Sequence, residues 1–144
     1  MTWYEADHAR LVIEYLRVSA RYPKFVLKRT DEGVLYWLGK IELTVGVIHP
    51  PVLQLRIEYP DSFPAIYPDA FVMEPSLSED HLGHKWHRWP STGAICYVKP
   101  KIWQLGTTAD EVISKCEDWY FNYIAATNGL IDEMPEVGRA VLKG

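Results

Sequence analysis

Apolar residues near the N-terminus recur with the spacing of one face of an α-helix. The residues in this set are Leu11, Val12, Tyr15, Leu16 and Tyr22. Thr2 and Glu5 have the spacing of a capping box at a helix start. Pro23 is expected to end the helix, because proline cannot continue the backbone hydrogen-bond pattern. The pattern therefore predicts an amphipathic helix over about residues 3–21.

The next part of the chain is typical of short strands joined by turns. Aromatic and branched residues predict strands at residues 25–29, 34–43, 53–59 and 71–74. In the third predicted strand every second residue is apolar: Leu53, Leu55, Ile57 and Tyr59. Such alternation is typical of a half-buried strand in an antiparallel sheet. Prolines at 60, 64 and 68 exclude a central strand there, so this stretch is predicted to be a rigid surface loop.

The second half of the chain contains a long aperiodic segment followed by a clear helical pattern. Residues 76–106 show no period, and loops of that length inside a compact domain are usually functional. Thr108 and Glu111 again have capping-box spacing, and apolar positions predict a helix over about 109–126. Residues 127–144 are expected to form a short final helix or a tail. The order of elements predicts one α+β domain over residues 1–144, with helices packed on a four-stranded antiparallel meander.

Composition narrows the class of partner. The chain has 144 residues, 48% hydrophobic and 24% charged, with a net charge of -4. An acidic chain without a basic patch argues against nucleic acid as the partner. No apolar run is long enough to span a membrane, and the N-terminus lacks the pattern of a signal peptide. We therefore expect a cytoplasmic protein that does not contact membranes.

The two cysteines lie in different contexts. Cys116 falls on the apolar stripe of the second predicted helix, where a thiol is expected to be a small core residue. Cys96 lies in the long loop, where nucleophiles carried by a rigid scaffold tend to be found. Nearby Lys99, Lys101 and His87 are expected to lower the pKa of the Cys96 thiol. From this chemistry alone, a cysteine that lies near a histidine by chance is the more frequent case.

Several short motifs resemble ubiquitin-conjugating enzymes. Gly93-Ala94-Ile95-Cys96 matches the Gly-x-Ile-Cys of that family's active site. Tyr59-Pro60 and Phe63-Pro64 resemble its Tyr-Pro…Pro-Pro stretch, and Trp103 resembles the Trp that follows the cysteine. The resemblance covers roughly residues 3–126. It implies a ubiquitin-conjugating-enzyme-like fold with an N-terminal helix, a four-stranded meander, a long active-site loop and C-terminal helices.

One departure from the eukaryotic enzymes concerns the active site. Trp86 and Arg88 stand where those enzymes have the His and Asn of His-Pro-Asn. The string from His87 to Trp103 is more similar to the bacterial branch found in CBASS antiphage operons. In that branch the conjugating protein acts on the C-terminus of a cGAS-like nucleotidyltransferase, and some operons add an activating enzyme. The resemblance thus implies protein partners of these kinds and no bound cofactor.

The resemblance also implies roles for particular residues. Cys96 would carry the C-terminus of a partner protein as a thioester and pass it to a lysine amine. His87 is the candidate to replace the missing Asn, as a donor to the oxyanion or as a base. A hydrogen bond that merely fixes the loop is an equal alternative for His87. Arg88 is a weaker candidate for the oxyanion.

Partner-binding positions are expected on the first helix and on the proline-rich loop. Arg10 and Arg17 are assigned to the polar side of the helix, and Phe63 and Pro64 to the loop. This family tends to meet its partners at these two places. A solvated helix face without a partner is the alternative.

Three other interpretations are a zinc site, a cysteine hydrolase and a non-catalytic binding module. His81, His84 and His87 are spaced by three residues, and with Cys96 they could be zinc ligands. Structural zinc sites usually bring paired cysteines, so no metal is expected. A cysteine hydrolase that uses Cys96 and His87 is one alternative to a conjugating enzyme, and a non-catalytic binding module of the same fold is another.

Overall fold

The computed structural model describes all residues 1–144 and contains one four-stranded antiparallel sheet. The strands are β1 (Val26–Arg29), β2 (Leu35–Ile41), β3 (Leu53–Glu58) and β4 (Asp69–Glu74). They pair in chain order, so the sheet is a simple meander. All four predicted strands are present, and β4 begins two residues before its predicted start.

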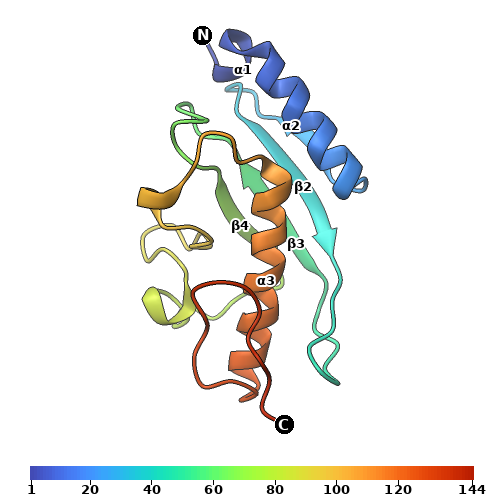
Figure 1. The fold of residues 1–144 in the computed structure, drawn as a ribbon, viewed down its shortest axis with the longest axis vertical. Helices are drawn as coiled ribbons and strands as arrows, with labels where there is room; N and C mark the ends of the chain where they lie inside the picture. The colour runs from blue at the N-terminus through green and yellow to red at the C-terminus, as the bar shows by residue number, and fades with distance from the viewer.

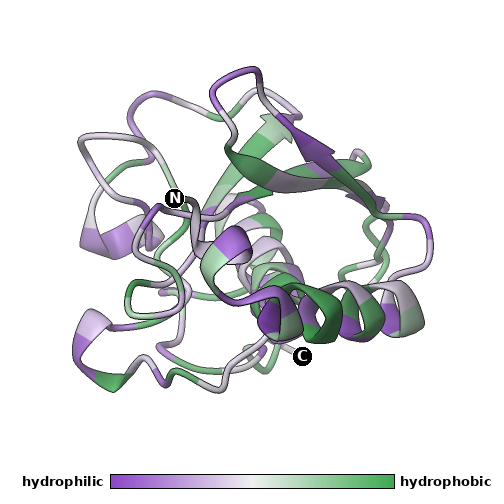
Figure 2. Ribbon diagram, turned by 90° about the horizontal axis from the view of Figure 1, so that it is seen from above, coloured by the Kyte–Doolittle hydropathy of each residue, from purple (hydrophilic) through white to green (hydrophobic).

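Helices cover one face of this sheet. They are α1 (Trp3–Ala6), α2 (His8–Arg21) and α3 (Ala109–Thr127), with single turns η1 (His84–Trp86) and η2 (Pro100–Ile102) in the long loop. Figures 1 and 2 show α2 and α3 on the same side of the sheet, with α3 running along it. The predicted α+β architecture is confirmed. No helix is long and apolar enough to cross a bilayer.

The core lies between the sheet and α3. Leu53, Leu55 and Ile57 of β3 are completely buried, as their alternation predicts. Phe25 lies flat against Gly39 of β2, where a Cβ atom would come within 2.3 Å of the aromatic ring. A side chain at Gly39 would therefore displace this ring from the core.

The first helix departs from the prediction in two ways. It is divided at Asp7, whose side chain accepts from the Arg10 N–H and begins α2. Its predicted apolar stripe is also largely exposed, including Tyr15 at 52% and Leu16 at 61%. The buried residues of α2 are instead Glu14 and Val18. Figure 2 shows the resulting hydrophobic turns along the outside of the molecule.

Hydrogen bonds to Glu14 explain why α2 buries this residue and not the predicted apolar stripe. One carboxylate oxygen of Glu14 accepts from the Tyr59 hydroxyl at 2.8 Å and from the Ala109 N–H at 2.9 Å. The other oxygen accepts from Arg10 Nε at 3.2 Å. Burial raises the pKa of Glu14, although these hydrogen bonds favour its charged form. The carboxylate thus joins α2 to the end of β3 and to the first turn of α3.

The chain after α3 forms an irregular tail rather than a second C-terminal helix. The tail occupies residues 128–144, and Figure 1 shows it looping beside the lower end of α3. Ile131 and Met134 are buried in the core. The buried Asn122 amide donates to the Gly138 carbonyl and accepts from the Ala140 N–H, both at 2.8 Å. These contacts fix the tail against α3.

Candidate active site

The backbone around Cys96 is held from two sides. Ile95 N–H donates to the Ala70 carbonyl of β4 at 2.8 Å, which fastens the loop to the sheet. Cys96 N–H donates to the His87 carbonyl at 2.7 Å, which fastens it to the preceding turn. His87 has a left-handed backbone with φ of 51°. The Cys96 side chain is itself partly exposed. A rigid support with an accessible thiol suits a nucleophile.

Arg88 braces this loop from within. Its Nε donates to the Gly93 carbonyl at 3.0 Å, and its Nη1 donates to the His81 carbonyl at 2.9 Å. Gly93 has φ of +75°, and a Cβ atom there would lie 3.0 Å from an Arg88 nitrogen. These bonds engage Nε and Nη1 of the Arg88 guanidinium in holding the loop, and Arg88 also lines the pocket beside Cys96.

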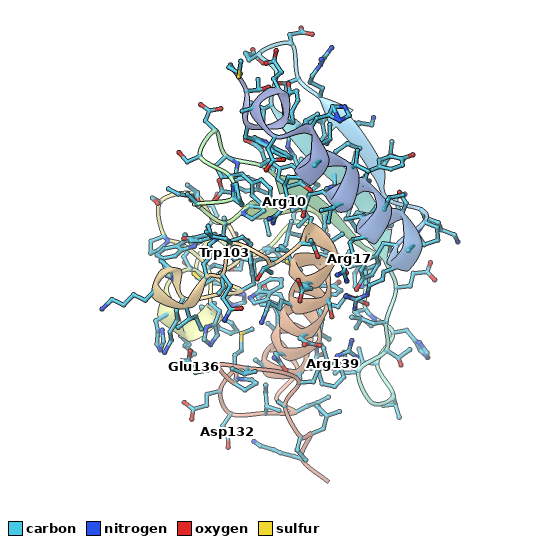
Figure 3. All side chains as sticks on the ribbon, turned by 45° about the horizontal axis from the view of Figure 1, so that its top comes forward. Arg10, Arg17, Trp103, Asp132, Glu136 and Arg139 are labelled. Carbon is cyan, nitrogen blue, oxygen red and sulfur yellow. The ribbon has the colours of Figure 1, made fainter.

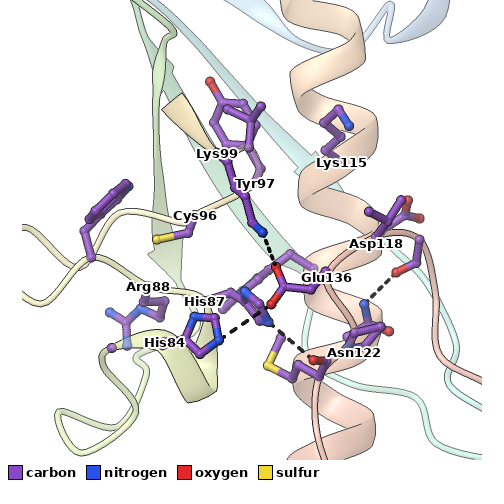
Figure 4. Close-up of a pocket in the computed structure, with 18 of the residues that line it drawn as sticks. His84, His87, Arg88, Cys96, Tyr97, Lys99, Lys115, Asp118, Asn122 and Glu136 are labelled. Atoms are coloured by element: carbon purple, nitrogen blue, oxygen red, sulfur yellow. Dashed lines mark hydrogen bonds and ion pairs between the residues drawn. The ribbon is translucent and has the colours of Figure 1, made fainter. Parts of the chain in front are cut away.

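A pocket of about 520 Å³ opens beside Cys96 (Figure 4). Its walls come from three separate parts of the chain: the loop around Cys96, the middle of α3 and the C-terminal tail. Polar groups around it include His84, His87, Lys99, Lys115 and Glu136. The tail was not expected to contribute, because nothing in its sequence relates it to the loop.

The electrostatic expectation for Cys96 is wrong. Burial raises the pKa of its thiol to about 11, and no neighbouring charge lowers it. The expected lysines are too exposed to stabilise the thiolate: Lys99 is 72% exposed, and its ammonium lies 3.9 Å from Glu136. Cys116 is completely buried, and burial raises the pKa of its thiol as well. Its expected place in the core is confirmed.

The ring of His87 faces the tail rather than the thiol. Its Nε2 lies 3.3 Å from the Met134 carbonyl oxygen. In Figure 4 the Cys96 sulfur points away from this ring. The two residues are linked only through their backbones. This geometry agrees with the alternative in which His87 fixes the loop by a hydrogen bond.

The three regularly spaced histidines do not converge on Cys96. His81 Nδ1 lies 2.7 Å from the Tyr123 hydroxyl, and its ring packs on Trp86 with centroids 4.0 Å apart. His84 and His87 instead approach Glu136 of the tail, with their ligand atoms within 4.8 Å of one another. A zinc set of three histidines and Cys96 is therefore not formed.

Aromatic residues fasten the proline-rich loop to the active-site loop. Trp103 Nε1 donates to the Pro64 carbonyl at 2.8 Å. The Tyr97 hydroxyl donates to the Pro68 carbonyl. Trp103 therefore holds together two segments 39 residues apart in the chain.

Two of the expected partner-binding residues make contacts within the protein itself. Phe63 is 3% exposed and packs against Trp3 and Tyr59. Arg10 lies over the Phe63 ring and donates to the Leu105 and Thr107 carbonyls. The assignment of Arg10 and Phe63 to a partner surface is therefore corrected.

The other two expected partner-binding residues remain accessible. Arg17 is exposed, whereas Pro64 is half-buried. Figure 3 shows that Arg10 and Arg17 both come from α2. They nevertheless differ in role, because Arg10 faces the end of the long loop and Arg17 faces solvent.

Comparison with solved structures supports the fold. The structure is similar to the yeast Vps23 UEV (ubiquitin E2 variant) domain, solved in complex with a Vps27 PSDP peptide. The TM-score is 0.54 with 12% sequence identity, and the match covers 93% of this chain and 86% of that chain. A scan against protein-family models and a search of curated proteins find no match. The chain thus has a ubiquitin-conjugating-enzyme-like fold.

Proposed function

We propose that this protein is a ubiquitin-conjugating-like acyltransferase that carries the C-terminus of a partner protein as a thioester on Cys96. The observation that carries the proposal is the partly exposed Cys96 thiol at a pocket on a conjugating-enzyme scaffold. The pocket gives space beside the sulfur for an acyl group and for an incoming amine.

The chemistry is a pair of acyl transfers. The Cys96 sulfur attacks the carbonyl carbon of an activated C-terminus, its proton passes to solvent, and the donor's leaving group departs. A lysine amine then attacks the new thioester, loses a proton and releases Cys96 as a thiol. A thiol with a pKa of about 11 is mostly protonated at neutral pH. Transfer of the acyl group from a donor thioester to Cys96 is nearly balanced at equilibrium, and it proceeds through the small fraction of Cys96 that is thiolate.

The resemblance to the bacterial branch supplies the proposed setting. We propose a cytoplasmic role in antiphage defence of the CBASS type, with a cGAS-like nucleotidyltransferase as the acyl donor. Arg17 and Pro64 are the accessible members of the proposed partner surface. His87 is proposed to support Cys96 by fixing the loop through its carbonyl. The reaction requires no cofactor.

A second candidate function is a non-catalytic binding module. The similar Vps23 domain is a ubiquitin E2 variant, a class without catalytic activity, and its structure contains a bound peptide. The raised pKa of Cys96 also agrees with this alternative. A hydrolase that depends on a Cys96–His87 pair has less support, because no hydrogen bond joins the His87 ring to the sulfur.

The proposed function is tested by mixing the protein with the candidate nucleotidyltransferase and an activating enzyme, followed by non-reducing electrophoresis and intact mass spectrometry. A conjugating enzyme gives an adduct with the mass of both proteins that reductant removes. The adduct is absent in Cys96→Ala and becomes reductant-resistant in Cys96→Lys.

Two other outcomes assign a different function, and a third assigns the acyl group to a different residue. A stable complex that survives unchanged in Cys96→Ala, with no covalent adduct, assigns the binding module. Loss of a C-terminal segment from the nucleotidyltransferase without an adduct assigns the hydrolase. An adduct retained in Cys96→Ala but lost in Cys116→Ala would place the acyl group on the wrong thiol.

A further inference from the structure

We propose that His84, His87 and Glu136 form a binding site for a divalent transition-metal ion of the zinc type. The site lies at the wall of the Cys96 pocket, where the tail meets the active-site loop (Figure 4). A bound ion would join the tail to the turn that supports Cys96. The proposal does not depend on the chemistry of Cys96.

The distances between the candidate ligand atoms are close to those expected around a bound metal ion. All three candidate ligand atoms lie within 4.8 Å of one another. His84 Nε2 and Glu136 Oε1 are 3.6 Å apart. Two ligands about 2.1 Å from a tetrahedral zinc ion lie about 3.4 Å from each other. The His84–Glu136 pair is already near this separation, and the rest of the set lies within 4.8 Å.

The hydrogen bond of the His87 ring agrees with a role as a metal ligand. The Met134 carbonyl can only accept, so His87 Nε2, 3.3 Å away, carries the hydrogen. In the neutral ring, Nδ1 then has a free lone pair. Metal-bound histidines generally donate their other N–H to a carbonyl or carboxylate, which fixes the tautomer and the ring orientation. His87 has this arrangement before any ion binds.

The two carboxylate oxygens of Glu136 have different neighbours. Lys99 Nζ lies 3.9 Å from Oε2, whereas Oε1 faces His84. The ammonium group therefore lies nearer to one carboxylate oxygen, and the other oxygen is the one beside His84. His84 is 85% exposed and Glu136 is 52% exposed, so an ion can enter from solvent.

The donor set defines the class of ion. Two imidazoles and one carboxylate are the protein ligands of many open zinc sites, in which water completes the coordination. Imidazole also binds copper and nickel, whereas calcium and magnesium prefer oxygen ligands. We therefore expect Zn²⁺ to bind and Mg²⁺ not to bind.

The test is calorimetric titration of the reduced full-length protein with zinc chloride, together with thermal unfolding. One ion is expected to bind per chain. At a free zinc concentration about 100 times the dissociation constant, Tm should rise by several degrees. His84→Gln, His87→Gln and Glu136→Gln should each weaken binding at least about tenfold.

Two matched variants separate this site from other zinc binding. His49→Gln replaces an exposed histidine outside the cluster and should leave the affinity unchanged. Cys96→Ser should also bind zinc normally, because its sulfur is outside the set. Glutamine is the replacement in every histidine and glutamate variant, which limits the change in side-chain size.

Three results would overturn the proposal. Equal binding of zinc by wild type and Glu136→Gln would exclude the tail as a ligand. Loss of binding in Cys96→Ser would show that the thiol is the ligand instead. No heat and no change in Tm with zinc would show that His84 and Glu136 form only an ion pair.

Discussion

The two thiols of this protein have the same chemistry and opposite surroundings. Cys116 lies inside α3 with no exposed surface, whereas Cys96 lies in a loop at the edge of a pocket. Burial raises the pKa of both thiols. Access to solvent, and not acidity, therefore separates the candidate nucleophile from the structural cysteine.

The largest expected difference is in the rate of alkylation. In native protein with excess iodoacetamide, Cys96 should react at least about 10³-fold faster than Cys116. Cys116 becomes available only when the chain opens, and an open population of about 10⁻³ or less is typical. Peptide mass spectrometry at several times measures both rates. Comparable rates at the two positions would show that Cys96 is no more accessible than Cys116.

The second difference is in stability. Cys116→Ser should lower the free energy of unfolding by about 1–3 kcal/mol, because a hydroxyl replaces a buried apolar group. Cys96→Ser should change it by less than about 0.5 kcal/mol, as expected of a partly exposed loop position. Urea denaturation followed by tryptophan fluorescence measures both. An equal loss in the two variants would show that Cys96 is also a core residue.

The third difference appears in the pH dependence. The raised pKa of about 11 means that the folded state holds the Cys96 proton more tightly than an ordinary thiol does. The thiolate fraction, and with it the alkylation rate, should therefore rise about tenfold per pH unit from pH 7 to pH 10. A plateau near pH 8.5, the value of a free cysteine, would contradict the burial effect.

The smallest expected effect concerns the neighbouring lysine. Lys99→Gln should change the alkylation rate of Cys96 by less than about twofold, because its exposed ammonium is screened by solvent and lies near Glu136. Lys28→Gln, an exposed lysine on β1, is the matched control. A tenfold decrease in Lys99→Gln alone would restore the original interpretation of a thiol activated by positive charge.

The elements of the fold could be predicted because their patterns are local. The alternation in β3 depends only on adjacent residues, and the capping box of Thr108 and Glu111 is complete within one turn. The face of α2 could not be predicted in this way. Glu14 is buried because Tyr59 and Ala109 donate to it, and both are distant in the chain.

The candidate site was predicted in part for a similar reason. The motif that ends in Cys96 identifies a loop, and the structure places this thiol beside a pocket. The third wall of the pocket contains Met134 and Glu136, about forty residues after Cys96 in the chain. Both approach His87 in space, and no sequence spacing predicts that contact. The expected pKa was wrong because charges near in sequence extend into solvent, whereas burial acts on the sulfur itself.

The most direct measurement is the reaction of the native protein with a synthetic peptide thioester that ends in glycine, followed by intact and peptide mass spectrometry. We expect one acyl group on Cys96, removed by hydroxylamine and absent from Cys96→Ser, with Cys116 unmodified. A protein that stays unmodified, or that carries its first acyl group on Cys116 or on a lysine, would show that Cys96 is not the acyl carrier.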